Sequence, residues 1–141
     1  MSGGGVPELR EVAAAVLLRA DRVLVQTRPG PGRYQGYWEF PGGGVEPGED
    51  HHQALARECR EELDLAVAVH ERLHRVEWSY PRVRVAVSFF RCTPVEGAAE
   101  PRPVEGQELR WADRRDLDRL TFLPANAEIL ALLAERLGGT D

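Results

Sequence analysis

The chain has 141 residues, of which 43% are hydrophobic and 29% are charged, and its formal net charge is −5. A chain of this size can bury the core of one ordinary domain without disulfides or a structural metal. Its acidic balance argues against the broad basic face that duplex nucleic acid requires, so we expect no stable nucleic-acid complex. The longest apolar run, residues 12–18, is far shorter than the roughly 18–20 residues of a membrane span. We therefore expect no membrane association.

Cysteine and arginine usage bears on the compartment and on the ligand chemistry. Cys59 and Cys92 are too few for a disulfide framework and form no C-x-x-C pair, which indicates a reducing, cytoplasmic compartment. The opening residues, MSGGGVPELR, have no basic region followed by an apolar run, so we expect a flexible tail over residues 1–10 rather than a secretion signal. All 18 basic residues are arginines, so phosphate must be bound by arginine, backbone or metal.

The first half of the chain predicts a hairpin, an isolated strand and a helix. Residues 12–18 and 23–26 are apolar and flank a short polar turn, which is typical of a β-hairpin. A loop rich in glycine and proline leads to a short aromatic strand at residues 37–40, and the Pro-Gly-Gly-Gly that follows is expected to end it. Asp50 is a suitable N-cap for a helix over residues 51–63.

The second half predicts another hairpin and a final helix. Residues 67–78 and 83–92 are rich in β-branched and aromatic side chains on either side of a Tyr-Pro-Arg turn. Residues 93–107 are predicted to be a loop and residues 108–112 a strand. Pro124 is expected to open a helix that ends at Gly138-Gly139. This mixed order predicts an α/β fold with a partly parallel sheet, formed by a single domain over residues 11–138, either monomeric or homodimeric.

Three carboxylates crowd one flank of the central helix. Glu58, Glu61 and Glu62 stand at i, i+3 and i+4, so their side chains are neighbours on the helix surface. Like charges at these offsets repel by about 0.2–0.5 kcal/mol per pair, and a divalent cation would convert this repulsion into attraction. Oxygen ligands of this kind suit Mg²⁺, or alternatively Mn²⁺.

The spacing around these glutamates follows a longer pattern. Gly43 is followed after five residues by Glu49 and after seven more by residues 57–65, RECREELDL. This resembles the Nudix box, G-x5-E-x7-R-E-U-x-E-E-x-G-U, where U is a bulky apolar residue. Cys59 is a mild departure because buried cysteine behaves as a small hydrophobe. Asp64 replaces the last glycine, where we expect local strain but no loss of function.

The Nudix resemblance implies both a fold and a reaction. The fold is an α/β/α sandwich with a mixed sheet and a loop-helix-loop metal site, and the reaction is hydrolysis of a nucleoside diphosphate linked to another group. By the same resemblance, Glu58, Glu61 and Glu62 bind the metal together with the carbonyl of Gly42. The structural support of the site is assigned to Gly43, Glu49 and Arg57, of which Arg57 would pair with Glu49.

Residues outside the box resemble the MutT branch, which hydrolyses 8-oxo-dGTP to 8-oxo-dGMP and pyrophosphate. The segment around Glu105 implies a further metal-binding or catalytic glutamate, and the general base is then either Glu58 or Glu105, with Glu61 also in the catalytic set. Asn126 is implied to read the oxidised purine. The side chains expected to touch the nucleotide are Asn126 and Phe40, Phe122 and Arg28. Gly44 departs from the lysine that MutT-like enzymes often carry, so a phosphate or charge contact is missing there.

Less specific interpretations compete with several of these assignments. Asn126 lies near a helix start and could be a cap, and Glu105 lies in a polar loop where simple exposure is the alternative. His70 and His74 are expected on one face of a strand but far apart, which argues against a zinc site. His51 and His52 are expected to be exposed, and the three tryptophans, Trp38, Trp78 and Trp111, to be packing residues.

Two other functions remain open. One is a Nudix hydrolase with another substrate, such as cytidine triphosphates, ADP-ribose or a dinucleotide; Pro81 fits ADP-ribose hydrolases as well and does not discriminate. The other is a non-catalytic Nudix-like binding module, although such modules usually lose the box carboxylates that this chain keeps.

Overall fold

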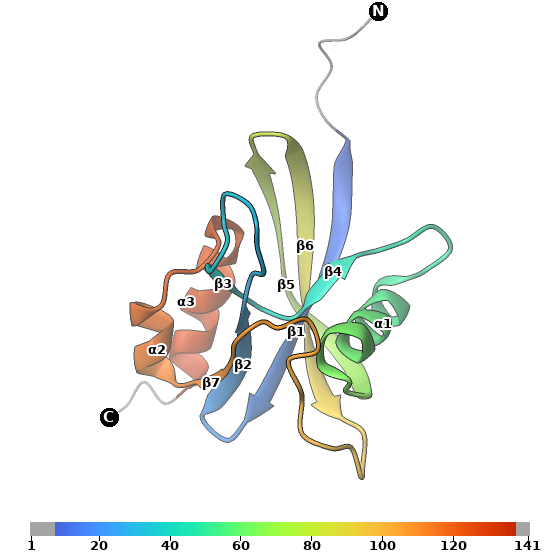
Figure 1. Ribbon diagram of the computed structural model, residues 1–141, viewed down its shortest axis with the longest axis vertical. Helices are drawn as coiled ribbons and strands as arrows, with labels where there is room; N and C mark the ends of the chain where they lie inside the picture. The colour runs from blue at the N-terminus through green and yellow to red at the C-terminus, as the bar shows by residue number, and fades with distance from the viewer. Residues whose placement is uncertain (1–7, 138–141) are drawn as a thin grey trace, which may run out of the picture.

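A mixed β-sheet lies between two helical layers in the computed structural model, which describes residues 8–137 (Figure 1). Helix α1 lies on one side of the sheet and helices α2 and α3 lie on the other. The elements in chain order are β1 (Leu9–Arg19), β2 (Arg22–Thr27), β3 (Trp38–Glu39), β4 (Gly42–Gly44), α1 (His51–Leu63), β5 (Val67–Tyr80), β6 (Val83–Pro94), β7 (Leu109–Ala112), α2 (Arg114–Arg119), a 3-10 helix (Pro124–Asn126) and α3 (Ala127–Arg136).

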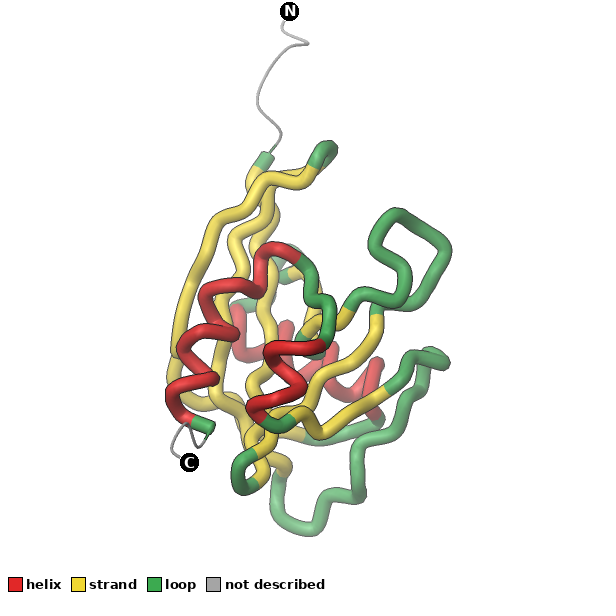
Figure 2. Tube along the Cα trace, turned by 90° about the vertical axis from the view of Figure 1, so that its left-hand side faces the viewer, coloured by secondary structure: helices red, strands yellow, loops and turns green. Residues whose placement is uncertain are grey.

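The sheet order among the described residues is β3-β2-β1-β6-β5, with β4 added to β1 and β7 added to β2. Strands β1 and β6 run parallel, from Leu9 opposite Arg84 to Leu17 opposite Cys92, whereas the other pairs are antiparallel. Figure 2, turned by 90°, shows helices in front of and behind the long strands. The predicted α/β/α sandwich with a partly parallel sheet is therefore confirmed.

Strand β1 supplies both halves of the core, because successive side chains of a strand point to opposite faces. Ala14 and Val16 pack in the cluster that contains Ile129 and Leu133 of α3. On the other face Ala13, Ala15 and Leu17 pack in the cluster that contains Leu55, Cys59 and Leu63 of α1. The apolar run of residues 12–18 is thus continuous because both faces of the strand are covered. No helix within residues 8–137 is long and apolar enough to cross a membrane.

Helix α1 begins and ends where the sequence predicts. The Asp50 side chain accepts a hydrogen bond of 2.7 Å from the Gln53 N–H, and the Gln53 side chain accepts one of 2.9 Å from the Asp50 N–H, a reciprocal capping box. Asp64 ends the helix in the left-handed conformation, with φ 52° and ψ 43°. Its side chain pairs with Arg102 at 3.5 Å. The expected local strain at Asp64 therefore sits beside an exposed ion pair.

Both hairpins are confirmed, but several boundaries differ from the prediction. Strand β1 begins at Leu9, so Leu9 and Arg10 belong to the sheet rather than to the expected tail; residues 1–7 lie outside the described residues. Residues 42–44 were expected only to break the chain, whereas they form β4 and pair with β1. Three consecutive glycines carry no side-chain pattern that could have predicted this strand.

The C-terminal helices also differ from the prediction. Helix α2 was not predicted, because its six residues, RRDLDR, are mostly charged and too few to show a helical period. Pro124 opens a 3-10 helix that continues as α3 to Arg136, and the expected end at Gly138-Gly139 lies outside the described residues.

Trp38 is buried, as expected, and Arg19 lies 4.1 Å from the ring centroid of Trp111. Trp78 is 40% exposed, so its prediction as a packing residue is wrong.

Candidate active site

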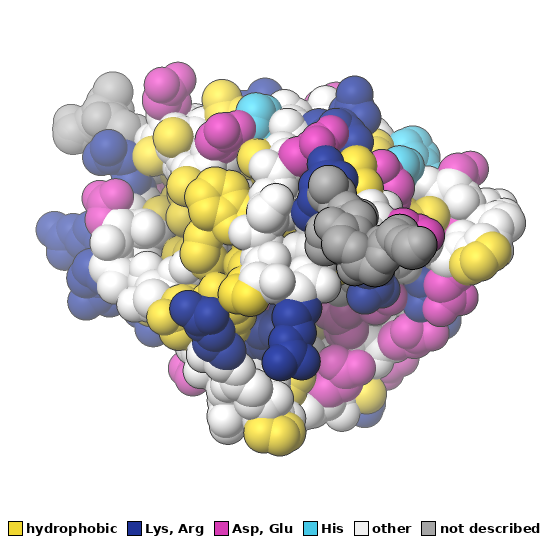
Figure 3. Space-filling view, turned by 90° about the horizontal axis from the view of Figure 1, so that it is seen from above, with side chains coloured by type: hydrophobic (Ala, Val, Ile, Leu, Met, Phe, Trp, Pro, Cys, Tyr) yellow, Lys and Arg dark blue, Asp and Glu magenta, His cyan; other side chains and the backbone are white. Residues whose placement is uncertain are grey.

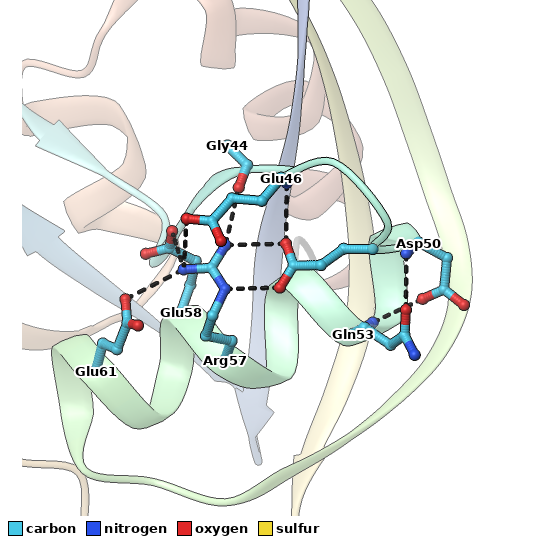
Figure 4. A network of polar contacts seen from close by, with 8 residues as sticks. Gly44, Glu46, Asp50, Gln53, Arg57, Glu58 and Glu61 are labelled. Carbon is cyan, nitrogen blue, oxygen red and sulfur yellow. Dashed lines mark hydrogen bonds and ion pairs between the residues drawn. The ribbon is translucent and has the colours of Figure 1, made fainter.

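Arg57 ties helix α1 to the loop that precedes it (Figure 4). Its Nε and Nη2 donate to the two oxygens of Glu49 at 2.7 and 3.1 Å, and Nη2 also donates to the carbonyl of Gly44 at 3.0 Å. Its Nη1 donates to Glu58 at 3.1 Å and to Glu61 at 3.2 Å. The bond to Glu49 is the main reason that the pKa of Arg57 is raised above its ordinary value. Arg57 is thus a permanently charged link between loop and helix.

Glu49 is fully engaged by this link. Besides Arg57, its Oε1 accepts a hydrogen bond of 2.9 Å from the Glu46 N–H. The hydrogen bond from Arg57, followed by that from the Glu46 N–H, lowers the pKa of Glu49. Because both carboxylate oxygens are already bound, Glu49 is placed to hold the loop rather than to bind a ligand.

Glu62 of α1 is a buried carboxylate, only 7% exposed, that faces β2 and β4. Its Oε1 accepts a hydrogen bond of 2.7 Å from Gln26 Nε2 and a longer one of 3.4 Å from the Gly42 N–H. Burial raises the pKa of Glu62, and the Glu58 carboxyl within hydrogen-bonding reach raises it further. Two carboxyl groups in such contact can share a proton or a cation, and the oxygen-only donor set fits a hard divalent cation.

The glycines of β4 bring backbone directly against these carboxylates. A Cβ atom on Gly43 would overlap the Glu58 carboxylate. Gly42 has φ +152°, and a Cβ atom there would overlap the carbonyl of Ala13 on β1. The close approach of β4 to β1 and the positive φ therefore require glycine at residue 42, whereas glycine at residue 43 leaves room for the Glu58 carboxylate of α1.

The other two predicted acidic ligands lie further out. The Glu61 side chain is 55% exposed and turns to Arg57. Glu105 is exposed in the turn before Gln107 and lies near Glu39. Burial is the main reason that the pKa of Glu39 is raised, and the nearby charge of Glu105 raises it further. Within residues 8–137 no three His, Cys, Asp or Glu side chains are gathered as a metal cage. The structure thus brings together Glu58 and Glu62 but not the whole predicted ligand set.

Three of the four histidines have different polar partners. Nε2 of His51 lies 3.2 Å from Glu11, that of His70 lies 2.8 Å from Thr93, and that of His74 contacts Glu128 at 2.6 Å. His52 is exposed, as expected, whereas His51 is half-buried. Because His70 and His74 have different partners, the structure gives no support to a zinc site between them.

A cavity of about 620 Å³ opens beside β4 and is large enough for a nucleotide. Its lining includes residues 42–44 and three of the predicted substrate contacts, Arg28, Phe40 and Asn126. Phe122 does not line it; its ring stacks on Phe40 with centroids 5.9 Å apart, so it supports Phe40 from behind. Figure 3 shows hydrophobic side chains gathered on this end of the molecule with arginines beside them.

Asn126 is 6% exposed and lines the cavity. Its side chain makes no capping hydrogen bond to α3, and among the described residues it has no other hydrogen-bond partner. The alternative role as a helix cap is therefore not supported. A buried amide that lines a cavity without a protein partner can bind a ligand through both its donor and its acceptor.

Two buried glutamines of the site were missed by sequence reasoning. Gln107 Nε2 donates to Gln26 Oε1 at 3.1 Å and to the Glu62 carbonyl at 3.0 Å, and its Oε1 accepts from the Glu105 N–H at 2.9 Å. Gln26 thus receives from Gln107 and donates to Glu62. A glutamine that directly follows the apolar residues of β2 is a signal that could have pointed to Gln26.

The aromatic wall of the cavity was also missed. Tyr34 and Tyr80 both line it and meet edge to face with ring centroids 5.4 Å apart. The Tyr80 hydroxyl accepts a hydrogen bond of 3.2 Å from the Ala125 N–H, next to Asn126. Arg28, expected to reach a phosphate, is paired with Glu39 at 3.1 Å.

Comparison with known proteins places this geometry in a family. The NUDIX domain model matches residues 13–132. The chain is 48% identical over 120 residues to the CTP pyrophosphohydrolase of Escherichia coli, covering 85% of this chain and 87% of that protein. It is 40% identical over 92 residues to the 8-oxo-dGTP diphosphatase of Haemophilus influenzae, covering 65% and 66%. The solution structure of the E. coli ORF135 protein aligns with a TM-score of 0.76 at 30% identity, over 94% of this chain and 96% of that one.

Proposed function

Because this chain belongs to the Nudix family of hydrolases, we propose that it converts a nucleoside triphosphate, 8-oxo-dGTP, into the monophosphate and pyrophosphate. The observation that carries the proposal is the shared cavity: residues 42–44, which lie against the Glu58 and Glu62 carboxyls, line the same cavity as the unpartnered amide of Asn126. Removing this nucleotide before it is incorporated would protect DNA from mutation.

Hydrolases of this family generally depend on a divalent metal, and we assign Mg²⁺ here. The residues that would hold it are Glu58, Glu61, Glu62, Glu105 and the carbonyl of Gly42. Bound Mg²⁺ would neutralise phosphate charge and acidify a water molecule. Either Glu58 or Glu105 accepts the proton of the water whose oxygen attacks the β-phosphorus. The bond from that phosphorus to the oxygen bridging the α- and β-phosphates then breaks and releases the monophosphate.

The remaining residues of the site orient the reacting groups. Arg57 holds Glu58 and Glu61 at fixed positions relative to the loop, because it also binds Glu49. Gln26 orients Glu62 without neutralising it, since an amide donates a hydrogen bond but carries no charge. These contacts keep carboxylates in place for a cation.

Recognition of the base is assigned to the apolar part of the cavity. The amide of Asn126 can bind a purine edge through paired donor and acceptor atoms. Phe40 offers its ring directly, while Phe122 acts by packing against Phe40. Arg28 would bind a phosphate once the nucleotide draws it from Glu39.

A cytidine triphosphate is the second candidate substrate. It is favoured by the 48% identity to a protein named CTP pyrophosphohydrolase, over 85% of this chain. The same carboxylates and the same bond cleavage would serve both substrates, and only the base-binding part of the cavity would differ.

We further propose that residues 11–138, together with Leu9 and Arg10 of β1, act as one catalytic domain in the cytoplasm. Two features support this: a single sheet joins all the strands of residues 8–137, and the two cysteines are buried and unpaired. Free thiols are typical of a reducing compartment.

The proposal is tested with a panel of nucleotides, including 8-oxo-dGTP, dGTP, CTP, ADP-ribose and a dinucleotide, with pyrophosphate and phosphate measured separately. We expect the highest kcat/KM for 8-oxo-dGTP and release of pyrophosphate. If kcat/KM were highest for CTP, CTP would replace 8-oxo-dGTP as the proposed substrate. Release of orthophosphate would contradict the assigned bond cleavage. The Glu58→Gln variant is the control for hydrolysis by contaminants.

A further inference from the structure

We propose that Arg10 is a phosphate-binding residue of this site and that its guanidinium takes the position a side chain on residue 44 would occupy. This inference rests on the proposed function only in that the ligand is a nucleotide phosphate chain. It also gives a physical reason for the presence of glycine at position 44, which the family pattern does not explain.

Strand alternation directs Arg10 toward the cavity. Residues of a strand two positions apart face the same side, and Arg10, Val12 and Ala14 of β1 all line the cavity. Val12 pairs with Gly44 and Ala14 pairs with Gly42 across the antiparallel β1–β4 ladder. Arg10 therefore lies at the outer end of the row that runs along β4.

Gly44 leaves room for this guanidinium. A Cβ atom built on Gly44 would lie 2.8 Å from Arg10 Nη2, while its next contact outside Arg10 would be the Glu11 carbonyl at 4.0 Å. Gly44 is not among the glycines with positive φ, so its backbone conformation does not require glycine. Arg10 is thus the group that crowds this position. The space that a side chain on residue 44 would fill is filled instead by a side chain from the neighbouring strand.

The charge of Arg10 is available to a ligand. Across residues 8–137 no carboxylate or hydrogen-bond acceptor engages Arg10, and the side chain is exposed. Arg28, which also lines the cavity, is paired with Glu39. The N–H groups of Arg57 already donate to carboxylates and to the Gly44 carbonyl. Arginine binds phosphate through two parallel N–H groups. Arg33 and Arg82 also line the cavity, but among the described residues it is the guanidinium of Arg10 that lies beside the Cβ position of Gly44, free to meet a phosphate oxygen.

The inference is tested by moving the charge between the two positions. Arg10→Ala should raise KM for the best nucleotide of the panel about tenfold, the usual effect of losing one charge-assisted hydrogen bond, with kcat changed less than about twofold. The double variant Arg10→Ala with Gly44→Lys should recover most of the lost affinity, because lysine at residue 44 would return a cationic side chain to the space that Arg10 had filled beside β4. Arg136→Ala, an exposed arginine on α3, is the matched control and should leave KM unchanged.

Affinity for inorganic tripolyphosphate in Mg²⁺ buffer, measured by calorimetry, separates this inference from the choice of nucleotide. We expect Arg10→Ala to weaken it about tenfold, whatever base the panel favours. Equal affinity of wild type and Arg10→Ala, including no binding by either, would overturn the role of Arg10. A loss that Gly44→Lys does not repair would overturn the shared position. Failure of 8-oxo-dGTP alone to be hydrolysed would overturn only the proposed substrate.

Discussion

Glu62 is held by residues that stand far from it in the sequence. Gln26 precedes it by 36 positions and Gln107 follows it by 45. Gln26 donates to the carboxylate itself, whereas Gln107 donates to Gln26 and to the backbone carbonyl of Glu62. Both are neutral amides, so they orient this residue without adding a charge that would compete with a cation. This explains why a buried acid whose pKa is raised by burial and by Glu58 can still be kept ready for a ligand.

Replacing Asn126 by alanine should change base preference more than it changes turnover. The amide is buried in the cavity and has no partner among the described residues, so its loss removes paired contacts to the base. We expect the ratio of kcat/KM for 8-oxo-dGTP to that for dGTP to fall about tenfold or more, as for loss of one paired base contact.

Phe122→Leu is the comparison for this prediction. Its ring packs behind Phe40 and does not line the cavity, so the preference ratio should change much less than in Asn126→Ala. An unchanged ratio in Asn126→Ala would remove Asn126 from base recognition and favour another nucleotide as substrate.

The residues of the site differ in how far sequence could predict them. Glu49, Arg57, Glu58, Glu61 and Glu62 follow fixed spacings along one loop and one helix, and local spacing translates directly into position on a helix. Gln26, Tyr34 and Tyr80 come from strands and turns that meet only after the sheet has formed. Their contribution depends on strand pairing, which no local pattern in the chain encodes.

At the scale of elements, the same distinction holds. Helix α1 was predicted to the residue, because a cap, an apolar face and a terminating position all agree. Strand β4 and helix α2 were missed: the first consists of glycines held by β1, and the second is one short turn closed by a capping box between Asp113 and Asp116. Both depend on their neighbours rather than on intrinsic propensity.

Asp64→Gly should stabilise the end of α1. Asp64 has φ 52°, a conformation that costs a residue with a Cβ atom roughly 1 kcal/mol and costs glycine little. The lost pair with Arg102 is exposed and offsets only part of this gain. We expect the free energy of unfolding in urea to rise by up to about 1 kcal/mol, with kcat unchanged.

Asp64→Ala is the matched control, because alanine keeps the Cβ atom and loses both the ion pair and the tolerance of aspartate for this conformation. It should lower the free energy of unfolding. If Asp64→Gly also lowered it, the pair with Arg102 would outweigh the backbone strain at this position.

At the scale of the whole molecule, the carboxylate site links one helix, two strands and a turn of the fold. Glu62 connects α1 to β2 through Gln26, to β4 through the Gly42 N–H, and to the turn before β7 through Gln107. A ligand bound there acts on several elements at once. Stability should therefore report metal binding for the molecule as a whole.

Magnesium should raise the melting temperature of the wild-type protein, and above Kd the rise should grow with the logarithm of the magnesium concentration. At a concentration 100 times Kd, binding to the folded state alone adds about 2.7 kcal/mol to the free energy of unfolding. Glu62→Gln should abolish this effect, because the amide keeps the shape and the hydrogen-bonding position but loses the charge. Chelation by EDTA should return the wild type to its metal-free melting temperature. An equal magnesium shift in Glu62→Gln would show that the cation binds elsewhere.

Strand β1 touches β2, β4 and β6, and its two faces serve different halves of the protein. One face carries the row of Arg10, Val12 and Ala14, and the other packs against α1. Inserting or deleting one residue in its middle would exchange the faces of every position on one side of the change. Cavity lining would then point into the α1 core. We therefore expect length changes to be tolerated at the exposed part of a loop, such as residues 96–100, and not in the middle of β1.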